Sequence, residues 1–485
     1  MPEKRILAID MGDSDGRAML GLYNGSRIKL EAVHRFPVRP VDVRGRLCHD
    51  VLRFYEEIKT GIGLAHKAGG FSSMGIDGWG CDFGLIDRDG QLLFNPFSCR
   101  DERSTGAMED FFSENSPSEL YGLTGLPHLR YNTVFQLFAM RDRPEIFAAA
   151  DKFLMMPDLL TYFLTGSKKS EFTVSSTTQM LNPYSKNWNG EVLAKIGIDP
   201  GLLCEVVPSG THAGMLSREI CNELNIRPAD VMYTAGHATA AAFAAAPAGE
   251  NSVYISSGTR ATMGARTKEP IINEAGRKYS FANEGACDGS FSFLKNISGL
   301  RLLQECRREW GDPPYTRLAR EAAEAEPFKC FIDPDDARFI PSGDMPGKIR
   351  AYCRAGGQYV PATRGEIARC IYESLAMRYR EALGQLRAAS GRIYTDICVV
   401  GDGSRLGMLS QFTADACGLL AADGPQDAAA GNIAAQLIAA GELKDLNEAR
   451  DMIARSFAKK DHKPENTAGW TAAYDRFFMA IRKTS

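Results

Sequence analysis

The alternation of apolar runs and turns is clearest at the start of the chain, in residues 6–22. An apolar run from Ile6 to Ile9 ends on Asp10, and a turn containing Gly12 and Gly16 follows before apolar residues resume at 18–22. This pattern predicts a strand, a tight turn and a second strand. Glycine suits turns that need a positive φ or a close approach of two backbone segments.

The same kind of pattern predicts mixed helices and strands over the rest of the first half. Strands are predicted at 28–36, 74–76, 83–86 and 231–235, and helices at 50–67, 104–112, 144–153, 157–164 and 240–246. Residues 173–180 are small and polar, which favours a binding or packing loop. An apolar stripe of period 3.6 makes the helix at 50–67 the clearest of these elements.

The opening pattern recurs about 247 residues further on, which indicates an internal repeat. A strand at 253–256, the turn Ser257-Gly258-Thr259 and a strand at 261–264 repeat its order, so the sequence predicts two domains of related design. Helices are predicted at 299–310 and 365–389, and the segment 328–357 is rich in proline and glycine and is expected to be irregular. A strand at 394–400 enters Gly401-Asp402-Gly403 and then a helix near residue 408, an order that can cradle a nucleotide.

Composition narrows the class of protein. The chain has 485 residues, 44% hydrophobic and 24% charged, which is typical of a soluble globular protein of several domains. A net charge of −3 argues against nucleic acid as a partner, and no apolar run approaches the roughly 20 residues of a membrane span. The twelve cysteines form no CxxC pair, and the N-terminus enters a strand directly, so we expect a cytoplasmic protein with reduced thiols.

Two stretches carry candidate chemistry. A carboxylate at a strand end before a glycine turn, as at Asp10, can serve a metal-phosphate group, although an ordinary hairpin is the alternative. Asp13 and Asp15 beside Arg17 make this turn a poor electrostatic field for a polyanion. The second stretch, residues 77–82, places a tryptophan between glycines and two carboxylates; this favours sugar stacking, and a core-anchoring tryptophan is the alternative.

Motifs in a fixed order along the whole chain resemble the FGGY carbohydrate kinases, most closely their rhamnulokinase branch. The matching stretches are GIDGWGCDFGLIDRDG, CRDERSTGAM, TGLPHLRYNTVFQL, LMMPDLLTYFLTG, EFTVSSTTQML, GHATAA, YISSGT, NEGACDG, FLKNISGL, PSGDMPGKI, GEIARCIYESLAMRY and SQFTADACGL. The resemblance implies an α/β fold with two ribonuclease-H-like (actin-like ATPase) domains and a central cleft. Residues 1–247 would form the sugar side and residues 248–485 the nucleotide side.

The resemblance also implies the ligands and their contacts. ATP with Mg²⁺ would phosphorylate the 1-hydroxyl of a ketose such as L-rhamnulose, and the protein would be a monomer or a homodimer with no nucleic-acid or membrane partner. The sugar would contact Trp79, Gly80, His237 and Thr239, and Asp10 would face the metal. The nucleotide would contact Asp13, Ser14, Asp15, Gly16, Arg17, Gly258, Thr259, Asn296, Gln304, Gly401, Asp402 and Gly403.

Several positions depart from the family pattern. Ala238 stands where the family has its catalytic base, an aspartate, and losing a general base costs about 10²–10⁴ in rate. Asp82 or Asp77 is a possible substitute base. Arg260 and Arg301 replace aromatic residues, and Asp402 replaces a glycine. The sequence therefore predicts a weakened sugar kinase, with a non-catalytic sugar- or nucleotide-binding sensor or scaffold as the alternative.

Overall fold

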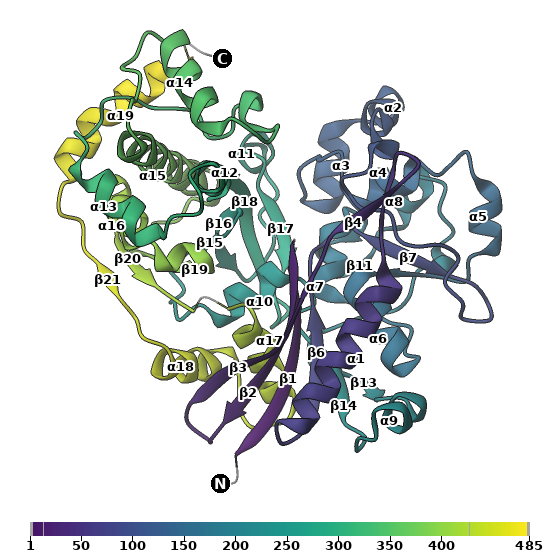
Figure 1. Cartoon of the computed structure of the whole chain (residues 1–485). Helices are drawn as coiled ribbons and strands as arrows, with labels where there is room; N and C mark the ends of the chain where they lie inside the picture. The colour runs from purple at the N-terminus through teal and green to yellow at the C-terminus, as the bar shows by residue number, and fades with distance from the viewer. Residues whose placement is uncertain (1–2, 13, 426, 483–485) are drawn as a thin grey trace. The chain divides into compact units, whose positions relative to one another are not determined.

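The computed structural model describes residues 3–12, 14–425 and 427–482, which form two compact units (Figure 1). Unit 1 comprises residues 1–245, 266–293 and 428–456, and unit 2 comprises residues 246–265, 294–427 and 457–485. Both units are mixed α/β, as predicted. The first change of unit lies close to the predicted domain boundary between residues 247 and 248, which stays a prediction because each unit also draws on later segments.

Unit 1 is built on a six-stranded sheet with the order β13-β14-β6-β1-β2-β3. Its strands are β1 (Lys4–Met11), β2 (Asp15–Tyr23), β3 (Ile28–Pro37), β6 (Ser73–Asp77), β13 (Thr211–Met215) and β14 (Asp230–Tyr233). Strands β1 and β2 form the predicted antiparallel hairpin, and β6 lies parallel to β1 on its other side. In this register Asp10 is opposite Arg17 on β2 and opposite Asp77 on β6.

Side chains of β1 alternate between two differently covered faces of this sheet. Leu7, Ile9 and Met11 belong to the core cluster that includes the apolar stripe of α1 (Val51–Lys67). On the other face, β-carbons added at Gly21 and Gly75 would lie 2.6 and 3.2 Å from atoms of α17 (Ala429–Ala439). Glycines on this face therefore let α17 approach the sheet backbone closely.

The remaining elements of unit 1 surround this sheet and a second core cluster. They are the strands β4 (Pro40–Val43), β5 (Arg46–His49), β7 (Phe83–Ile86), β8 (Lys152–Met155), β9 (Ser170–Glu171), β10 (Leu181–Asn182), β11 (Asn187–Trp188), β12 (Val206–Val207) and β17 (Ala282–Gly285), and the helices α2 (Ala107–Glu114), α3 (Pro117–Thr124), α4 (Thr133–Phe138), α5 (Pro144–Ala149), α6 (Met156–Thr165), α7 (Phe172–Ser175), α8 (Gly190–Lys195), α9 (Arg218–Leu224), α10 (Ala238–Ala245), α11 (Glu274–Lys278) and α18 (Leu446–Ser456). The second cluster joins residues of α2, α4, β7 and β8.

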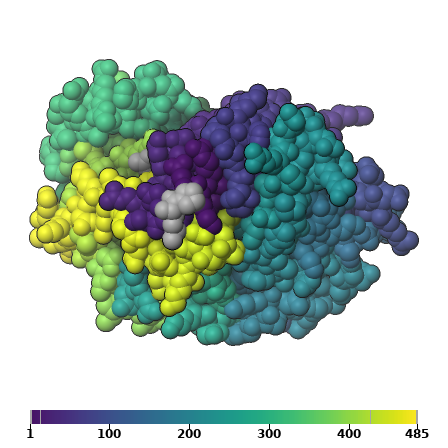
Figure 2. All heavy atoms as spheres, turned by 90° about the horizontal axis from the view of Figure 1, so that it is seen from below, coloured from purple at the N-terminus to yellow at the C-terminus, as the bar shows by residue number. Residues whose placement is uncertain are grey.

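The late segment of unit 1 packs against its earliest strands. Helix α18 contacts β3, and the backbone N–H of Ile28 donates to Ser456 Oγ at 2.9 Å. Figure 2 shows the yellow atoms of this C-terminal part of the chain beside the purple N-terminal strands. Unit 1 is thus completed by residues more than 400 positions away from its first strand.

Unit 2 repeats the plan of a hairpin beside a parallel strand, as the internal repeat predicted. In its sheet the strands β18 (Phe291–Ser298), β16 (Arg260–Thr267), β15 (Ser252–Ser257), β19 (Asp396–Val400), β20 (Leu420–Asp423) and β21 (Asp461–His462) follow in that order. Strands β15 and β16 are antiparallel, and β19 is parallel to β15. Its helices are α12 (Arg301–Glu309), α13 (Tyr315–Glu324), α14 (Met345–Ala355), α15 (Arg364–Ser390), α16 (Gly407–Cys417) and α19 (Thr467–Arg482).

Two segments that the sequence analysis left without regular structure are helical. Residues 172–178 form α7 and a 3₁₀ turn, in which Ser176, Thr177 and Thr178 donate their hydroxyls to carbonyls three residues back. Within 328–357, helix α14 begins after Asp344, whose side chain accepts a hydrogen bond from the Gly347 N–H. The proline of this helix, Pro346, lies in its first turn. Proline and glycine at a helix start were mistaken for signs of a loop.

One predicted helix is shorter than expected. The helix predicted at 144–153 ends at Ala149, and Lys152–Met155 instead forms β8, which pairs with β7. Among the residues that the structure describes, no helix is both long enough and apolar enough to span a membrane.

Candidate functional site

The predicted sugar-binding residues of unit 1 lie on two loops that hydrogen-bond to each other. The Gly78 N–H donates to the Gly236 carbonyl at 2.9 Å, and the Ala238 N–H donates to the Gly78 carbonyl at 2.7 Å. A β-carbon at Gly80 would lie 2.5 Å from Thr177 Oγ1, so this position needs a glycine. The structure therefore brings the turn that contains Trp79 and Gly80 beside His237, Ala238 and Thr239. These residues are far apart in the sequence, and the motifs alone did not show that they are neighbours.

Trp79 and Asp82 are anchored in one small polar cluster. The Trp79 Nε1–H donates to Asp82 Oδ2 at 2.8 Å, and His49 Nε2 lies 2.7 Å from the same oxygen. The Trp79 ring contacts the rings of His49 and Phe54, with centroids 5.0 and 6.3 Å away. Trp79 is half-buried, whereas the Asp82 side chain is buried. One carboxylate oxygen of Asp82 is thus committed to orienting the tryptophan.

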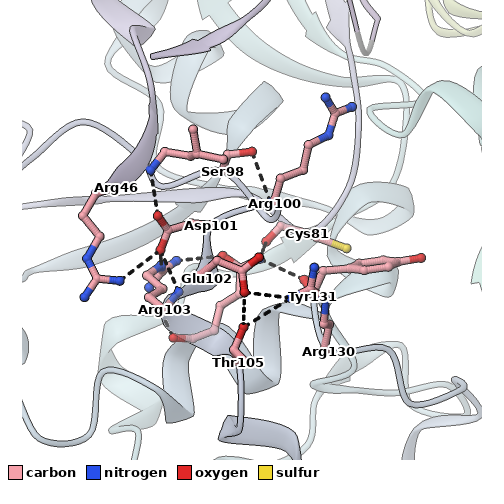
Figure 3. A network of polar contacts seen from close by, with 12 residues as sticks. Arg46, Cys81, Ser98, Arg100, Asp101, Glu102, Arg103, Thr105, Arg130 and Tyr131 are labelled. Atoms are coloured by element: carbon pink, nitrogen blue, oxygen red, sulfur yellow. Dashed lines mark hydrogen bonds and ion pairs between the residues drawn. The ribbon is translucent and has the colours of Figure 1, made fainter. Parts of the chain in front are cut away.

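A second network supports the same turn through the carbonyl of Cys81 (Figure 3). Buried Asp101 accepts the backbone N–H groups of Leu47 and Arg103, at 2.7 and 2.9 Å. The Arg103 guanidinium donates to Gln136 Oε1, and Gln136 Nε2 donates to the Cys81 carbonyl at 3.0 Å. Burial lowers the pKa of Arg103 to about 10, so the guanidinium stays charged at neutral pH. Residues 98–105 overlap the CRDERSTGAM motif of the family resemblance. They therefore support the turn indirectly, through the contact of Arg103 with Gln136.

The Gly236–Thr239 loop is held by a buried carboxylate that sequence reasoning gave no role. Glu171 Oε2 accepts the Thr173 hydroxyl at 2.6 Å and the Gly236 N–H at 3.2 Å. The Thr173 oxygen in turn accepts the His237 N–H at 3.0 Å. Burial raises the pKa of Glu171, and burial together with Glu171 raises the pKa of Asp158, whose carboxylate accepts the Glu171 N–H.

His237 also faces a carboxylate from a distant segment of unit 1. Its Nδ1 lies 3.2 Å from Oε2 of Glu284, which follows Asn283 in the NEGACDG motif. Both side chains are largely buried, with 13% and 17% of their surface exposed. Ala238 is the first residue of α10 and is half-buried. Glu171 and Glu284 both lie inside motifs of the family resemblance, and this was the one sign of them in the sequence. Nothing in those motifs indicated that both side chains contact the Gly236–Thr239 loop.

Asp10 sits at the end of β1, as predicted, and is engaged by Arg17. The two side chains form an ion pair across the hairpin, and only 4% of the Asp10 side chain is exposed. Asp77, its register neighbour on β6, is buried and accepts Asn432 Nδ2 at 2.6 Å. The ends of β1 and β6 thus bring two carboxylates and a guanidinium close together.

The turn after Asp10 is only partly described, because Asp13 lies outside the described residues. Gly12 and Gly16 have no positive φ; they are required for close approach, since a β-carbon at Gly16 would lie 2.3 Å from the Phe36 ring. Ser14 and Asp15 are exposed, and Asp15 Oδ2 lies 3.8 Å from the Arg35 guanidinium. The charge of Asp15 is therefore partly offset.

In unit 2 the two predicted nucleotide turns meet at the end of β15. Gly401 has a φ of +80°, and its added β-carbon would lie 2.9 Å from the Ser257 carbonyl; at Gly403 the distance to Ser257 Oγ would be 2.1 Å. The Gly258 carbonyl accepts the Leu300 N–H at 2.8 Å, which joins this turn to the start of α12. Asp402 is exposed.

A cavity of about 250 Å³ in unit 2 brings Thr259 and Asn296 together. Its lining also includes Arg260 and Arg301, two of the residues that depart from the family pattern, and Asp335 and Asp336. Gln304 lies on α12 but is not among the lining residues, and neither is the Gly401–Gly403 turn. The structure thus gathers part of the predicted nucleotide set around one cavity and leaves the rest outside it.

Comparison with known proteins identifies the class to which this fold and these loops belong. Residues 46–244 match the N-terminal domain of the FGGY family of carbohydrate kinases, and residues 253–440 match its C-terminal domain. The chain belongs to this family.

Its relatives include several rhamnulokinases. The chain is 41% identical to the rhamnulokinase of Bacteroides thetaiotaomicron over 99% of its own length and 100% of that protein. It is 37% identical to the rhamnulokinase of Oceanobacillus iheyensis over 93% of its length and 96% of that protein. In fold it is similar to the xylulose kinase of Lactobacillus acidophilus, with a TM-score of 0.82 at 16% identity over 98% and 97% of the two chains. The glycerol kinase of Plasmodium falciparum gives 0.79 at 14% identity, over 98% and 97%.

Proposed function

We propose that this chain is an ATP-dependent sugar kinase of the rhamnulokinase type, which phosphorylates a ketose such as L-rhamnulose at its 1-hydroxyl. Full-length similarity to rhamnulokinases supports the substrate class. The observation that carries the proposal is the pair of backbone hydrogen bonds that joins Gly78, the residue before Trp79, to Gly236 and Ala238, because a sugar needs a stacking ring and several polar groups on one side.

The proposed sugar contacts are Trp79, Gly80, His237 and Thr239. Asp82, Gln136 and Glu171 hold the two loops that carry these contacts in place through hydrogen bonds. Such support favours discrimination between sugars by their hydroxyl positions, because that requires donors and acceptors to be placed within a fraction of an ångström. His237, paired with Glu284, would hydrogen-bond a sugar hydroxyl.

The proposed nucleotide contacts are the two hairpin turns, Asn296, Gln304 and the Gly401–Gly403 turn. Arg260 and Arg301 line the same cavity as Thr259 and Asn296, and guanidinium groups bind phosphate oxygens well. Carboxylate oxygens suit Mg²⁺, so buried Asp10, with Asp77 beside it, fits a role in holding Mg²⁺ or its waters. Bound with the triphosphate, Mg²⁺ would supply charge neutralisation for the transferred phosphoryl group.

Because Ala238 stands at the position of the family's catalytic aspartate, this site lacks the usual general base. Asp82 or Asp77 was a possible substitute, and the hydrogen bonds of Asp82 to Trp79 and His49, with its burial, oppose that role for Asp82. Positioning and electrostatics carry much of phosphoryl transfer, so we propose slow turnover. The alternative is an inactive sugar- or nucleotide-binding sensor or scaffold, which the methyl side chain at the base position favours.

The decisive experiment compares the native chain with Ala238→Asp in a sugar-dependent ADP-release assay with L-rhamnulose and a panel of ketoses. We expect slow turnover by the native chain and a gain of about 10²–10⁴ in kcat for the variant. Asp82→Asn in the native background is expected to leave the residual rate within about threefold, because Asp82 acts through Trp79 rather than on the substrate.

The possible outcomes separate the two candidate functions. No turnover by the native chain, together with MgADP and ketose binding detected by calorimetry, would favour the sensor or scaffold. Turnover by neither chain and binding of neither ligand would overturn both.

A further inference from the structure

The side chain of His237 is the one ionisable group of the Gly236–Thr239 loop, because Ala238 carries only a methyl group. Hydrogen bonds fix the backbone on both sides of the imidazole. The His237 N–H donates to Thr173 Oγ1 at 3.0 Å, and the Ala238 N–H donates to the Gly78 carbonyl at 2.7 Å. The imidazole therefore projects from a rigid part of the loop, next to the position that the family fills with its catalytic aspartate.

The two ring nitrogens of His237 have different surroundings. Nδ1 is buried and lies 3.2 Å from Glu284 Oε2, in an orientation that falls short of a full hydrogen bond. Catalytic hydrogen bonds are often poorly aligned before substrate binds, and they tighten in the complex. Nε2 has no hydrogen-bond partner among the residues that the structure describes. Because a carboxylate beside Nδ1 favours the tautomer with its proton there, the lone pair of Nε2 is free to accept a proton.

Glu284 lies in strand β17, and both of its neighbours in the chain are anchored. The Asn283 side chain donates to the Gly125 carbonyl at 3.0 Å, and the Gly285 N–H donates to Ser176 Oγ at 2.7 Å. Only 17% of the Glu284 side chain is exposed. Its carboxylate is therefore held beside the imidazole by the packing of unit 1.

Proton uptake by His237 places a positive charge at the start of α10, and the nearby groups decide its cost. The N-terminal end of a helix disfavours a cation, since its free N–H groups carry partial positive charge. The carboxylate of Glu284 favours the cation and lies within ion-pair distance of the ring. The buried carboxyl group of Glu171 lies farther away, behind Thr173. The imidazolium is thus paired with Glu284, as the histidine of a catalytic triad is paired with its carboxylate.

The two aspartates considered as substitute bases are enclosed more deeply than His237. Asp77 and Asp82 are both 0% exposed, whereas 13% of the His237 side chain is exposed. Asp77 accepts a hydrogen bond from Asn432 Nδ2, and Asp82 accepts one from the Trp79 Nε1–H. A sugar hydroxyl can therefore reach His237 with less rearrangement of the protein.

We propose that His237 is the general base of the kinase reaction, with Glu284 as the residue that positions it; this inference rests on the function proposed above. The oxygen of the sugar's 1-hydroxyl forms a bond to the γ-phosphorus of ATP, while the bond between that phosphorus and the β–γ bridging oxygen breaks. The hydroxyl proton passes to His237 Nε2, and the electron pair of the broken bond leaves with ADP. The imidazolium then releases its proton to solvent.

The test measures transfer of phosphate from radiolabelled ATP to L-rhamnulose by the full chain and its variants. His237→Gln should lower kcat about 10- to 100-fold, less than the full value of a well-placed base, because the imidazole is one residue away from the family position. In the Ala238→Asp background the aspartate takes the proton, so His237→Gln should mainly raise KM and leave kcat within about threefold. Equal losses of kcat in both backgrounds would indicate a structural role and would overturn the assignment.

Glu284→Gln tests the positioning residue in the same two backgrounds. In the native background it should lower kcat by up to the factor found for His237→Gln, because glutamine no longer selects the tautomer of the imidazole. In the Ala238→Asp background it should leave kcat within about threefold. A loss of kcat confined to the Ala238→Asp background would contradict the role of Glu284.

The pH dependence of kcat is a readout that a structural role would not move. A base acts only when it is unprotonated, and free histidine gains its proton at about pH 6.5, whereas free aspartate does so at about pH 4. We therefore expect kcat of the native chain to fall as pH is lowered from about 8 to about 5.5, and kcat of Ala238→Asp to stay level over this range. A level profile for the native chain would overturn the assignment.

The matched control is His212→Gln, which alters an exposed histidine of the same unit whose Nε2 lies 2.9 Å from Asp230 Oδ1. It should leave kcat and KM within about twofold of the native values. Activity of His237→Gln in the Ala238→Asp background shows in the same assay that this change leaves the fold intact. Native turnover that survives His237→Gln unchanged overturns this inference alone, whereas no ketose-dependent turnover by the native chain overturns the proposed kinase activity with it.

Discussion

The two hairpins of the molecule share a backbone plan and differ in charge. In the first, Asp10 is the next-to-last residue of β1 and lies opposite Arg17; in the second, β15 ends on Ser257 opposite Ala261. Each has a parallel strand on its other side. The close approach in the first hairpin is made by its own Gly16, whereas in the second Gly401 and Gly403 of the turn after β19 approach Ser257. The comparison teaches that the repeat preserves the backbone plan of the hairpin, while the electrostatics of each turn depend on a few side chains.

The loops beside the two hairpins differ in the same way. The Gly236–Thr239 loop of unit 1 is held by the buried carboxylate of Glu171. The Gly401–Gly403 turn of unit 2 is held by neutral groups, since the Gly401 N–H donates to the Pro425 carbonyl and its own carbonyl accepts Ser404 Oγ at 2.8 Å. We therefore expect the Gly236–Thr239 loop to depend more strongly on charge and pH than the Gly401–Gly403 turn.

The largest effect is expected from breaking the ion pair of the first hairpin. Arg17→Met should lower the free energy of unfolding by about 2–3 kcal/mol, because Asp10 is buried and loses its pairing with Arg17; the partial exposure of Arg17 reduces the cost of a fully buried pair. Urea unfolding measures this value. In a double-mutant cycle with Asp10→Asn, the coupling should be about 1–3 kcal/mol. Thr262→Ser in the second hairpin is the control, and a cost equal to that of Arg17→Met would break the comparison.

The glycines at the two turns should show similar steric costs. Gly16→Ala would bring a methyl group 2.3 Å from the Phe36 ring, and Gly403→Ala would bring one 2.1 Å from Ser257 Oγ. Each should destabilise by about 1–3 kcal/mol, visible as a lower Tm. Gly384→Ala is the matched control, because it lies in helix α15 with nothing within 4 Å, and it should stabilise by about 0.5–1 kcal/mol. Unchanged stability in Gly16→Ala and Gly403→Ala would contradict the close approach.

A smaller effect is expected in the pH dependence of stability. Burial raises the pKa of both Asp158 and Glu171, so the folded state holds protons that the unfolded state has already lost. Their contribution is therefore fully present below the ordinary carboxyl pKa of about 4 and is lost as pH rises through the raised values. Urea unfolding across this range should give a shallower decline for Asp158→Asn and Glu171→Gln than for the native chain. An unchanged slope would show that neither carboxyl group is responsible.

The smallest effect is expected from the exposed carboxylate of the first turn. If phosphate groups approach this turn, Asp15→Ser should tighten MgADP binding by less than about 1 kcal/mol, because Asp15 is exposed and near Arg35. Calorimetry at low and high salt measures the change, which should shrink as salt increases. Asp89→Ser, on the Asp89–Gly90 turn, is the control. Equal affinity of Asp15→Ser and the native chain at low salt would indicate that the nucleotide does not reach this turn.

Local patterns predicted the scaffold more fully than the contacts within it. Both hairpins, α1 and α15 follow from apolar periodicity and turn residues, because these depend on neighbours in the sequence. The start of α14 was missed because Pro346 and Gly347 are typical turn residues, although proline is also favoured in the first turn of a helix.

The candidate site shows the same limit. Motifs identified Trp79, His237 and Thr259, but they could not show that Glu171 reaches Gly236 or that Glu284 reaches His237. The first of these contacts joins residues 65 positions apart, and the side-chain directions that create both contacts are fixed only when the whole unit packs. For the same reason the sequence could not show that Asp82 accepts hydrogen bonds within the Trp79 cluster, since its contact with His49 also joins distant segments.

Helix α17 has a consequence for how the protein is made. Its Asn432 donates to Asp77, 355 residues earlier, and its Gln436 donates to the Leu7 carbonyl, 429 residues earlier, at 3.1 Å, so β1 and β6 are contacted by a helix that is synthesised much later. We expect the face of the sheet that carries Gly21 and Gly75 to stay without α17 until residue 439 has emerged during synthesis. Unit 1 should then complete its folding only after residues 294–427 of unit 2 have been made, and a ribosome that stalls among them should leave an open sheet face, the kind of surface that chaperones bind.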